Sequence, residues 1–141
     1  MAAESFYVVL RTPGGTLLDE PGASAVEARA VDGDIEVRPG HEPLLAPLDT
    51  APLTVRATGG ERTYAVHGGF IEVKGERVRI LAGAAEEGGS IDLERAEMAK
   101  KRAEERLKKA RGGGEALDMD RAEMALKRAL LRLRILKEKA I

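Results

Sequence analysis

A short sequence phrase occurs twice in the last third of the chain, and no other feature constrains the fold as much. Residues 95–103 read RAEMAKKRA and residues 121–129 read RAEMALKRA. In both copies apolar residues recur every third or fourth position, which is typical of an amphipathic helix. Gly112-Gly113-Gly114 lies between the copies, and glycine has the conformational freedom that a chain reversal needs. The sequence therefore predicts two helices that fold back on each other as an antiparallel hairpin or open out at the glycines.

Both predicted helices have a polar residue where a cap is expected. Ser90 or Asp92 precedes the first helix and Asp118 begins the second, and their side-chain oxygens can accept hydrogen bonds from backbone amides of the first turn. The expected apolar stripes are Ala96, Ala99, Ala103, Leu107 and Ala110 on the first helix, and Ala122, Ala125, Leu126, Ala129, Leu130, Leu133 and Leu136 on the second. Small alanines let two helix axes approach closely, but they bury little area. We therefore expect a hairpin that is only weakly held closed.

Short runs with period-two alternation fill the first part of the chain. In residues 5–11, Phe6, Val8 and Leu10 fall on one face. Similar runs cover residues 25–31, 53–57, 63–67, 70–74 and 78–81, and glycines at 59–60, 68–69 and 75 read as breaks between them. Such runs, with no long helical window between them, predict a small β-sandwich or barrel. Because aromatic residues make up only 3% of the chain, we expect an aliphatic core.

Charge is divided unevenly between these two parts. Up to Gly89 the chain has 14 acidic and 8 basic side chains, whereas from Ser90 onward it has 10 acidic and 15 basic ones. Opposite net charges attract the two parts to each other through long-range fields. The basic excess also suits the tail to phosphate groups or to an acidic partner surface.

Several kinds of function lack the residues they need. Without cysteine the chain has no thiolate metal ligand, thiol nucleophile or disulfide. His41 and His67 are its only histidines, and neither has companions at metal-ligand spacing, so we expect no metal site. No nucleophile motif or carboxylate pair suggests a catalytic residue. There is no signal-peptide pattern and no apolar run near the roughly 20 residues that span a bilayer, so we expect an intracellular protein that is not inserted in a membrane.

Several segments together resemble the ε subunit of bacterial F-type ATP synthases. Residues 37–48 (VRPGHEPLLAPL) resemble that family's proline-glycine-histidine signature, and residues 66–73 (VHGGFIEV) with 78–82 (VRILA) resemble its second sandwich signature. Residues 91–96 (IDLERA) match its I/L-D-x-x-R-A motif at the start of the helical hairpin. These segments occur in the family's order and spacing from about Phe6 to Leu136. The chain departs from the family pattern at Glu36 and Arg38, near the turn that meets the rotor.

The resemblance implies a non-catalytic subunit of the central stalk of a proton-translocating ATP synthase, peripheral at the cytoplasmic face of the bacterial plasma membrane. Residues 1–88 would form a ten-stranded β-sandwich that binds the γ subunit and the ring of c subunits, with His41 and Glu42 among the contacts. Residues 89–141 would form the helical hairpin. The hairpin would extend along γ toward the catalytic β subunits, beside the α subunits, and restrain ATP hydrolysis. Arg128, Arg132 and Arg134 are expected to face an acidic segment of β.

The resemblance also implies that the folded hairpin binds one ATP as a regulatory ligand, not as a substrate, and no catalytic cofactor is expected. The residues implied in this contact are Glu86, Ile91, Asp92, Arg95, Ala96, Arg102, Arg128 and Arg132. Guanidinium groups suit a triphosphate because their donors match phosphate oxygens in pairs.

Two alternatives remain open at this stage. Residues 117–122 (LDMDRA) satisfy the same motif as residues 91–96. At least one of these copies is therefore expected to be only a capped helix start followed by an ion pair between residues three apart. The alternative for the whole chain is a free-standing ATP-sensing module, which would bind ATP without any partner protein.

Overall fold

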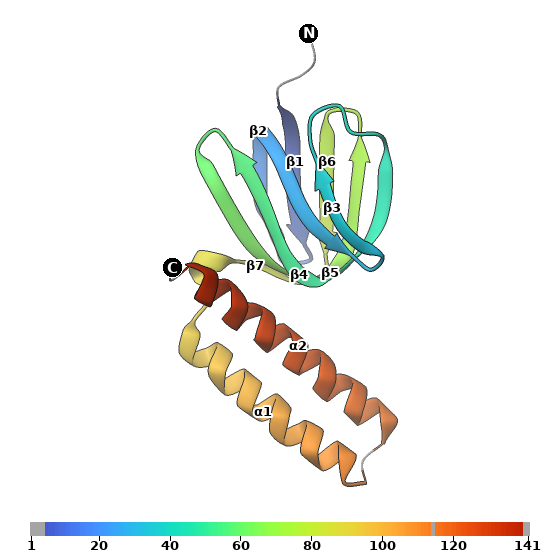
Figure 1. Cartoon of the computed structure of the whole chain (residues 1–141), viewed down its shortest axis with the longest axis vertical. Coiled ribbons are helices and arrows are strands. Elements are labelled where there is room, and N and C mark those ends of the chain that lie inside the picture. The colour runs from blue at the N-terminus through green and yellow to red at the C-terminus, as the bar shows by residue number, and fades with distance from the viewer. Residues whose placement is uncertain (1–4, 114, 140–141) are drawn as a thin grey trace. The chain divides into compact units, whose positions relative to one another are not determined.

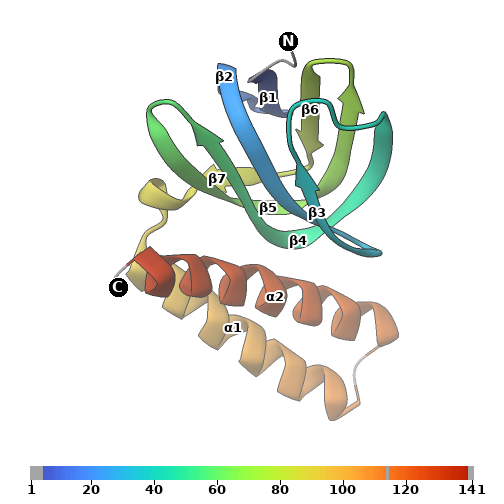
Figure 2. The same cartoon turned by 45° about the horizontal axis from the view of Figure 1, so that its top comes forward.

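A computed structural model describes residues 5–113 and 115–139, together with the side chains of these residues except that of Lys139. Gly114 of the predicted hinge and the two ends of the chain lie outside this part. The chain divides into two compact units, Met1–Gly88 and Gly89–Ile141. The first is built of strands and the second of two α-helices (Figures 1 and 2). A 3₁₀ turn at Gly88–Ser90 spans their boundary.

The described part of the first unit contains seven strands, so the implied number of ten is wrong. They are β1 Phe6–Thr12, β2 Gly15–Ala30, β3 Gly33–Val37, β4 Leu44–Ala57, β5 Gly60–Lys74, β6 Arg77–Ala82 and β7 Ala85–Glu87. Three of them are long, with 16, 14 and 15 residues in β2, β4 and β5. These long strands run through Pro21, Pro47 and Gly68, which a sequence-based reading takes as breaks. The number is therefore lower because single strands bend where separate strands were expected.

The strands close into a ring. The order along the sheet is β1-β6-β5-β4-β2-β3, and β1 also pairs with β2. Five strands thus form a closed barrel, while β3 extends from β2 and β7 pairs with β5 (Figure 1). The β1–β6 pair is parallel and the other described pairs are antiparallel. This closed sheet belongs to the class of small β-sandwich or barrel that the alternating runs predict.

The interior of the barrel is largely aliphatic. Phe6, Val8 and Leu10 are all buried, as their alternation in β1 predicts. Further buried members of the core are Leu18, Val26, Val37, Leu53, Val55, Val66, Ile71, Val73, Val78 and Ile80. Tyr64 is the largest fully buried side chain, so the core is not as purely aliphatic as the low aromatic content suggests. Burial raises the pKa of Tyr64 because the charged phenolate is poorly solvated there.

Gly69 shows why one predicted break is absent. It lies within β5, opposite Leu48 of β4 and Ala82 of β6, and has a φ of 133°. A Cβ atom added at this position would lie 2.1 Å from the Leu81 carbonyl oxygen. Glycine is therefore required by the close approach of two backbones in a continuous strand, not by a turn.

The second unit is an antiparallel pair of helices, α1 Leu93–Arg111 and α2 Ala116–Lys139, which lie side by side in both views (Figures 1 and 2). Asp92 caps α1, since its Oδ1 accepts a hydrogen bond from the Arg95 amide at 3.0 Å. The expected cap at Asp118 is wrong. Because α2 already begins at Ala116, Asp118 lies inside its first turn. At the other end of α1, Gly112 is the C-cap and donates to the Lys108 carbonyl oxygen at 3.2 Å.

Alanines form much of the buried surface of this helix pair. On α1 the buried residues are Ala96, Ala103, Leu107 and Ala110. On α2 they include Ala122 and Ala129, together with Leu131 and Ile135. Leu130, which was expected in the stripe, is 45% exposed. Leu131 lies about 200° around the helix from Ala129, so α2 has a second apolar face that the stripe prediction missed. Neither helix, within the residues described, is both long and apolar enough to cross a membrane.

Candidate ligand and partner sites

Two rows of arginines lie on one side of the helix pair. Arg95, Arg102 and Arg106 follow one another on α1 at spacings of seven and four residues, so they share a face. Arg121 and Arg128 occupy on α2 the positions of Arg95 and Arg102 in the repeated phrase. The two helices of an antiparallel pair are related by a twofold axis that is perpendicular to both. On each helix the arginines directly precede buried residues that face the other helix, so this axis places both rows on the same side of the pair. In agreement with this, Arg106 and Arg121 line one cavity.

The arginines implied in ATP binding differ in their surroundings. Arg95 and Arg102 are exposed and Arg128 is half-buried, and none of the three forms an ion pair with a residue that the structure describes. Arg132 is half-buried and, unlike these three, does interact with another group. Cationic side chains without partners attract phosphate at little cost, because no existing ion pair has to be broken.

Three other residues implied in ATP binding have structural roles within the helical unit. Asp92 is the N-cap of α1, Ala96 is 2% exposed among the buried alanines, and Ile91 is buried just before the helix begins. In this first copy of the motif, capping and packing therefore account for the aspartate, the alanine and the isoleucine. Arg95 is the motif residue whose side chain has no such role.

Glu86 belongs to the sandwich and has a partner there. It lies in β7, and its Oε1 is 3.4 Å from Nε2 of His67 in β5. The His67 side chain is 5% exposed. The structure thus brings Glu86 to His67, whereas the other seven residues implied in ATP binding lie in the second unit.

The residues expected to meet partners occupy two kinds of surface. His41 and Glu42 lie in the loop between β3 and β4, where the His41 amide donates to the Arg38 carbonyl oxygen at 3.1 Å and closes a turn. The nearby Leu45 is 68% exposed. On α2, Arg134 forms an ion pair with Glu138 at 3.0 Å. Such an exposed pair contributes less than about 1 kcal/mol, so it leaves Arg134 available to another acidic group.

An apolar hollow lies on the sandwich surface, and Phe70 in its lining pairs with Pro47, two residues from Leu45. The hollow lies where the ends of β1 and β6 meet the middle of β5, and its lining includes His67, Phe70 and Leu81. Phe70 and Leu81 are 54% and 48% exposed. Neighbouring exposed apolar side chains of this size are typical of a surface that another protein covers. The sequence signal was the alternation of β5 and β6, which places both residues outside the core.

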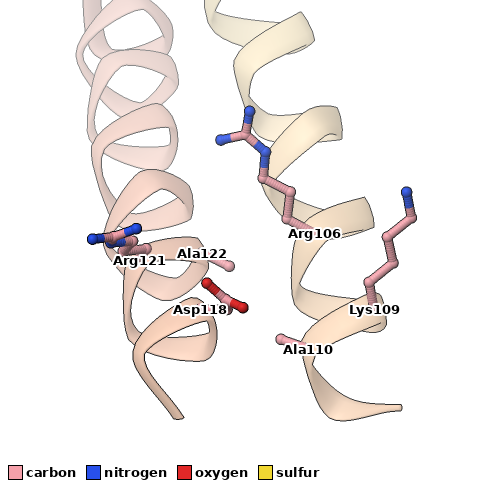
Figure 3. Close-up of a pocket in the computed structure, with 6 residues that line it drawn as sticks. All are labelled: Arg106, Lys109, Ala110, Asp118, Arg121 and Ala122. Carbon is pink, nitrogen blue, oxygen red and sulfur yellow. The ribbon is translucent and has the colours of Figure 1, made fainter. Parts of the chain in front are cut away.

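A second cavity lies between the two helices at their glycine end, and sequence reasoning did not identify it. Its volume is about 370 Å³, and it is lined by Arg106, Lys109, Ala110, Asp118, Arg121 and Ala122. Figure 3 shows Asp118 pointing from α2 toward Ala110 of α1, with the Arg106 side chain above it. The signal in the sequence was the second copy of the motif, which supplies Asp118, Arg121 and Ala122. The α1 residues could be added only once the helices were paired.

Comparison with known proteins accounts for both units. Residues 5–88 match the family described as "ATP synthase, Delta/Epsilon chain, beta-sandwich domain". Residues 90–137 match the family described as "ATP synthase, Delta/Epsilon chain, long alpha-helix domain". Together these two matches span most of the chain.

Individual relatives agree with the family matches. The chain is similar to the ATP synthase epsilon chain of Brevibacillus brevis, with 49% identity over 60% of this chain and 65% of that one. It is 47% identical to the epsilon chain of Bacillus velezensis over 70% of this chain and 74% of that one. A chain in the Euglena gracilis mitochondrial ATP synthase structure (OSCP/F1/c-ring, rotational state 1) has the same fold, with a TM-score of 0.80 at 24% identity over 99% of this chain and 83% of that one. A chain in the Tetrahymena thermophila mitochondrial ATP synthase central stalk and c-ring structure has a TM-score of 0.66 at 16% identity, over 96% and 99%. The chain belongs to the delta/epsilon chain family of ATP synthases, among the bacterial epsilon chains.

Proposed function

We propose that this chain is a non-catalytic rotor subunit of a bacterial F-type ATP synthase. In this role the sandwich binds γ and the c ring, and the helical hairpin opens to restrain ATP hydrolysis by the β subunits. The folded hairpin binds ATP as a regulatory ligand. The subunit is peripheral, at the cytoplasmic face of the membrane that holds the c ring. The proposal draws on the family, on the two units and on the way the helices are paired.

The observation that carries the regulatory part is the small contact between the two helices. Five of the buried residues that belong to the expected stripes on the two helices are alanines, Ala96, Ala103, Ala110, Ala122 and Ala129. Burial of apolar surface stabilises by about 25 cal/mol per Å², so each alanine contributes less than a leucine would. The free energies of the closed and open hairpin then differ by only a few kcal/mol. A ligand or partner that binds one form more tightly can therefore shift the population toward it. The glycines at 112 and 113 supply the place where the chain can reorient.

The sandwich offers the surfaces that a rotor subunit needs. The exposed Leu45, Phe70 and Leu81 share one outward face of the sheet, because Phe70 pairs with Leu81 of β6 and with Pro47 of β4, two residues from Leu45. An exposed apolar face of this kind is typical of a surface that other proteins cover, which suits binding to γ and the c ring. Charge on the helical unit supports the remaining contact, because Arg128, Arg132 and Arg134 lie on α2 and can approach an acidic segment of β.

Truncation tests the braking function directly. A chain that ends at Arg111 keeps every strand but loses α2, so the sandwich should fold and assemble with γ as the full chain does. The truncated complex should then hydrolyse ATP faster than the complex with the full chain. Equal rates in the two complexes, measured at equal incorporation of the subunit, would show that this tail is not the brake.

Two measurements, one without a partner and one with γ, distinguish the rotor subunit from a free-standing ATP-sensing module. Calorimetry with the isolated chain should give heat on addition of ATP, and Arg95→Ala should reduce the affinity. Arg134→Ala is a matched control, because Arg134 lies outside the residues implied in ATP binding. Co-elution with purified γ decides between the two functions. A chain that binds ATP but forms no complex with γ would be a sensing module only.

A further inference from the structure

The cavity at the glycine end of the helix pair is a basic site in its own right. Three cations, Arg106 and Lys109 from α1 and Arg121 from α2, line it with one carboxylate, that of Asp118 (Figure 3). The four charges sum to +2. None of these side chains forms an ion pair within 4.0 Å with any residue that the structure describes. The positive charge of the cavity is therefore not neutralised within the described chain.

Local structure does not explain Asp118 and Arg121 as it explains Asp92. Asp92 caps α1 through the Arg95 amide. Asp118 makes no corresponding bond, because α2 begins two residues earlier, and it forms no ion pair with Arg121. The expectation of a capped helix start with an ion pair therefore fails for the second copy. What these two residues do share is the lining of one cavity with the basic residues of the facing helix.

Both the shape and the charge of the cavity suit a small multivalent anion. Ala110 and Ala122 are 7% and 2% exposed and lie on the facing sides of the helices, where their short side chains leave space. A volume of about 370 Å³ falls in the range of small-molecule sites. The C-terminal end of α1 and the N-terminal end of α2 meet here, so their dipoles oppose each other. The cationic side chains must supply the attraction.

We propose that this hinge cavity binds a phosphate-bearing anion, with Arg106 and Arg121 as its donors and with Lys109, whose side chain extends away from α2 in Figure 3, adding positive charge at its edge. The site is separate from the ATP contacts proposed around Arg95 and Arg102. A phosphoryl group held between the two helices connects α1 to α2 beside Gly112 and Gly113, and so stabilises the closed hairpin. The stabilisation of the closed hairpin rests on the proposed function, in which the hairpin opens and closes, whereas the binding of the anion does not.

The test uses the full chain and inorganic pyrophosphate as the probe, followed by amide chemical shifts. Pyrophosphate should shift the amides of residues 109–113 and 118–122. Arg121→Gln should weaken this binding by about tenfold or more, because it removes a charge-assisted hydrogen bond. Arg95→Gln is the matched control at the same position of the repeated phrase and should leave the binding at the hinge unchanged. Both substitutions exchange one helix-forming residue for another, and far-UV circular dichroism checks that helicity is retained.

A second variant distinguishes a built site from a basic tail. Asp118→Asn removes the one negative charge and should tighten pyrophosphate binding. Equal weakening by Arg95→Gln and Arg121→Gln, or weaker binding in Asp118→Asn, would overturn the proposal, as would the absence of shifts at the hinge. ATP in a parallel titration identifies the source of the phosphate. Shifts at the hinge with ATP indicate a nucleotide site, and shifts with pyrophosphate alone indicate an inorganic anion. If ATP causes no shifts near Arg95 while pyrophosphate still shifts the amides at the hinge, only the proposed ATP site is contradicted.

Discussion

Leu107 is the position at which the stability of the helix pair is most directly tested. It is the one large side chain among the four buried residues of α1, all of whose residues the structure describes, and it is 8% exposed. Leu107→Ala removes three carbon atoms from this contact. At about 0.8 kcal/mol for each buried methylene, the loss is about 2 kcal/mol, and it is larger if the cavity does not collapse.

Met98→Ala is the matched control. Met98 is on the same helix but 54% exposed, so its truncation removes less buried surface and should cost well under 1 kcal/mol. Leucine, methionine and alanine are all good helix formers. The difference between the two variants therefore measures packing and not helix propensity.

Amide hydrogen exchange of the full chain gives the result for each unit separately. In Leu107→Ala, opening of the helical unit should become about thirtyfold more frequent, which corresponds to about 2 kcal/mol. Exchange in β1 to β6 should not change, because the substitution lies outside the sandwich unit. If Leu107→Ala and Met98→Ala accelerated exchange equally, the helices would not be held closed by this contact, and the argument from the small buried surface would fail.

Three further predictions concern positions with a single dominant cause. Gly69→Ala should destabilise the sandwich by about 2 kcal/mol or more, because Gly69 has a positive φ and the Leu81 carbonyl lies close to it. In the control Gly59→Ala the added Cβ atom has no neighbour within 4 Å, so the denaturation midpoint should be nearly unchanged. Asp92→Ala should destabilise α1 by about 1 kcal/mol through loss of its cap, measured as faster exchange in its first turn. Tyr64 is held neutral in the folded state by burial, which raises its pKa above 10. The stability this provides is present below pH 10 and is lost as the pH rises through the raised pKa. The denaturation midpoint should therefore decrease when the pH is raised above 10, and the decrease should be smaller in Tyr64→Phe.

The sequence predicts those parts of the fold that depend on one short segment. The period of two in β1 places Phe6, Val8 and Leu10 in the core, and each of them is buried. Asp92 was one of two residues proposed to cap the first helix, and it does so. In these cases the residues that decide the outcome are neighbours along the chain, so their spacing contains the information.

The predictions that were wrong or missing concern features that depend on residues far apart in the sequence. Gly69 was expected at a break, but it is fixed by the approach of the Leu81 backbone from another strand. Leu130 and Leu131 are adjacent on a helix with leucines on several faces, and only the fold shows that Leu131 is the buried one. The hinge cavity likewise requires Lys109 and Arg121 to come from different helices. The spacing of residues within one helix could not indicate this.

The parallel pairing of β1 with β6 determines when the sandwich can form during synthesis. Leu10 pairs with Ile80, so the barrel cannot close until β6 has been made and has left the ribosome. Until then β1 has an unpaired edge that is open to other chains. The two helices are made later but depend on contacts that are close in sequence, and such contacts form quickly. Closure of the barrel should therefore be the slow step in folding, and the helix pair, although made last, should reach its structure within a shorter time.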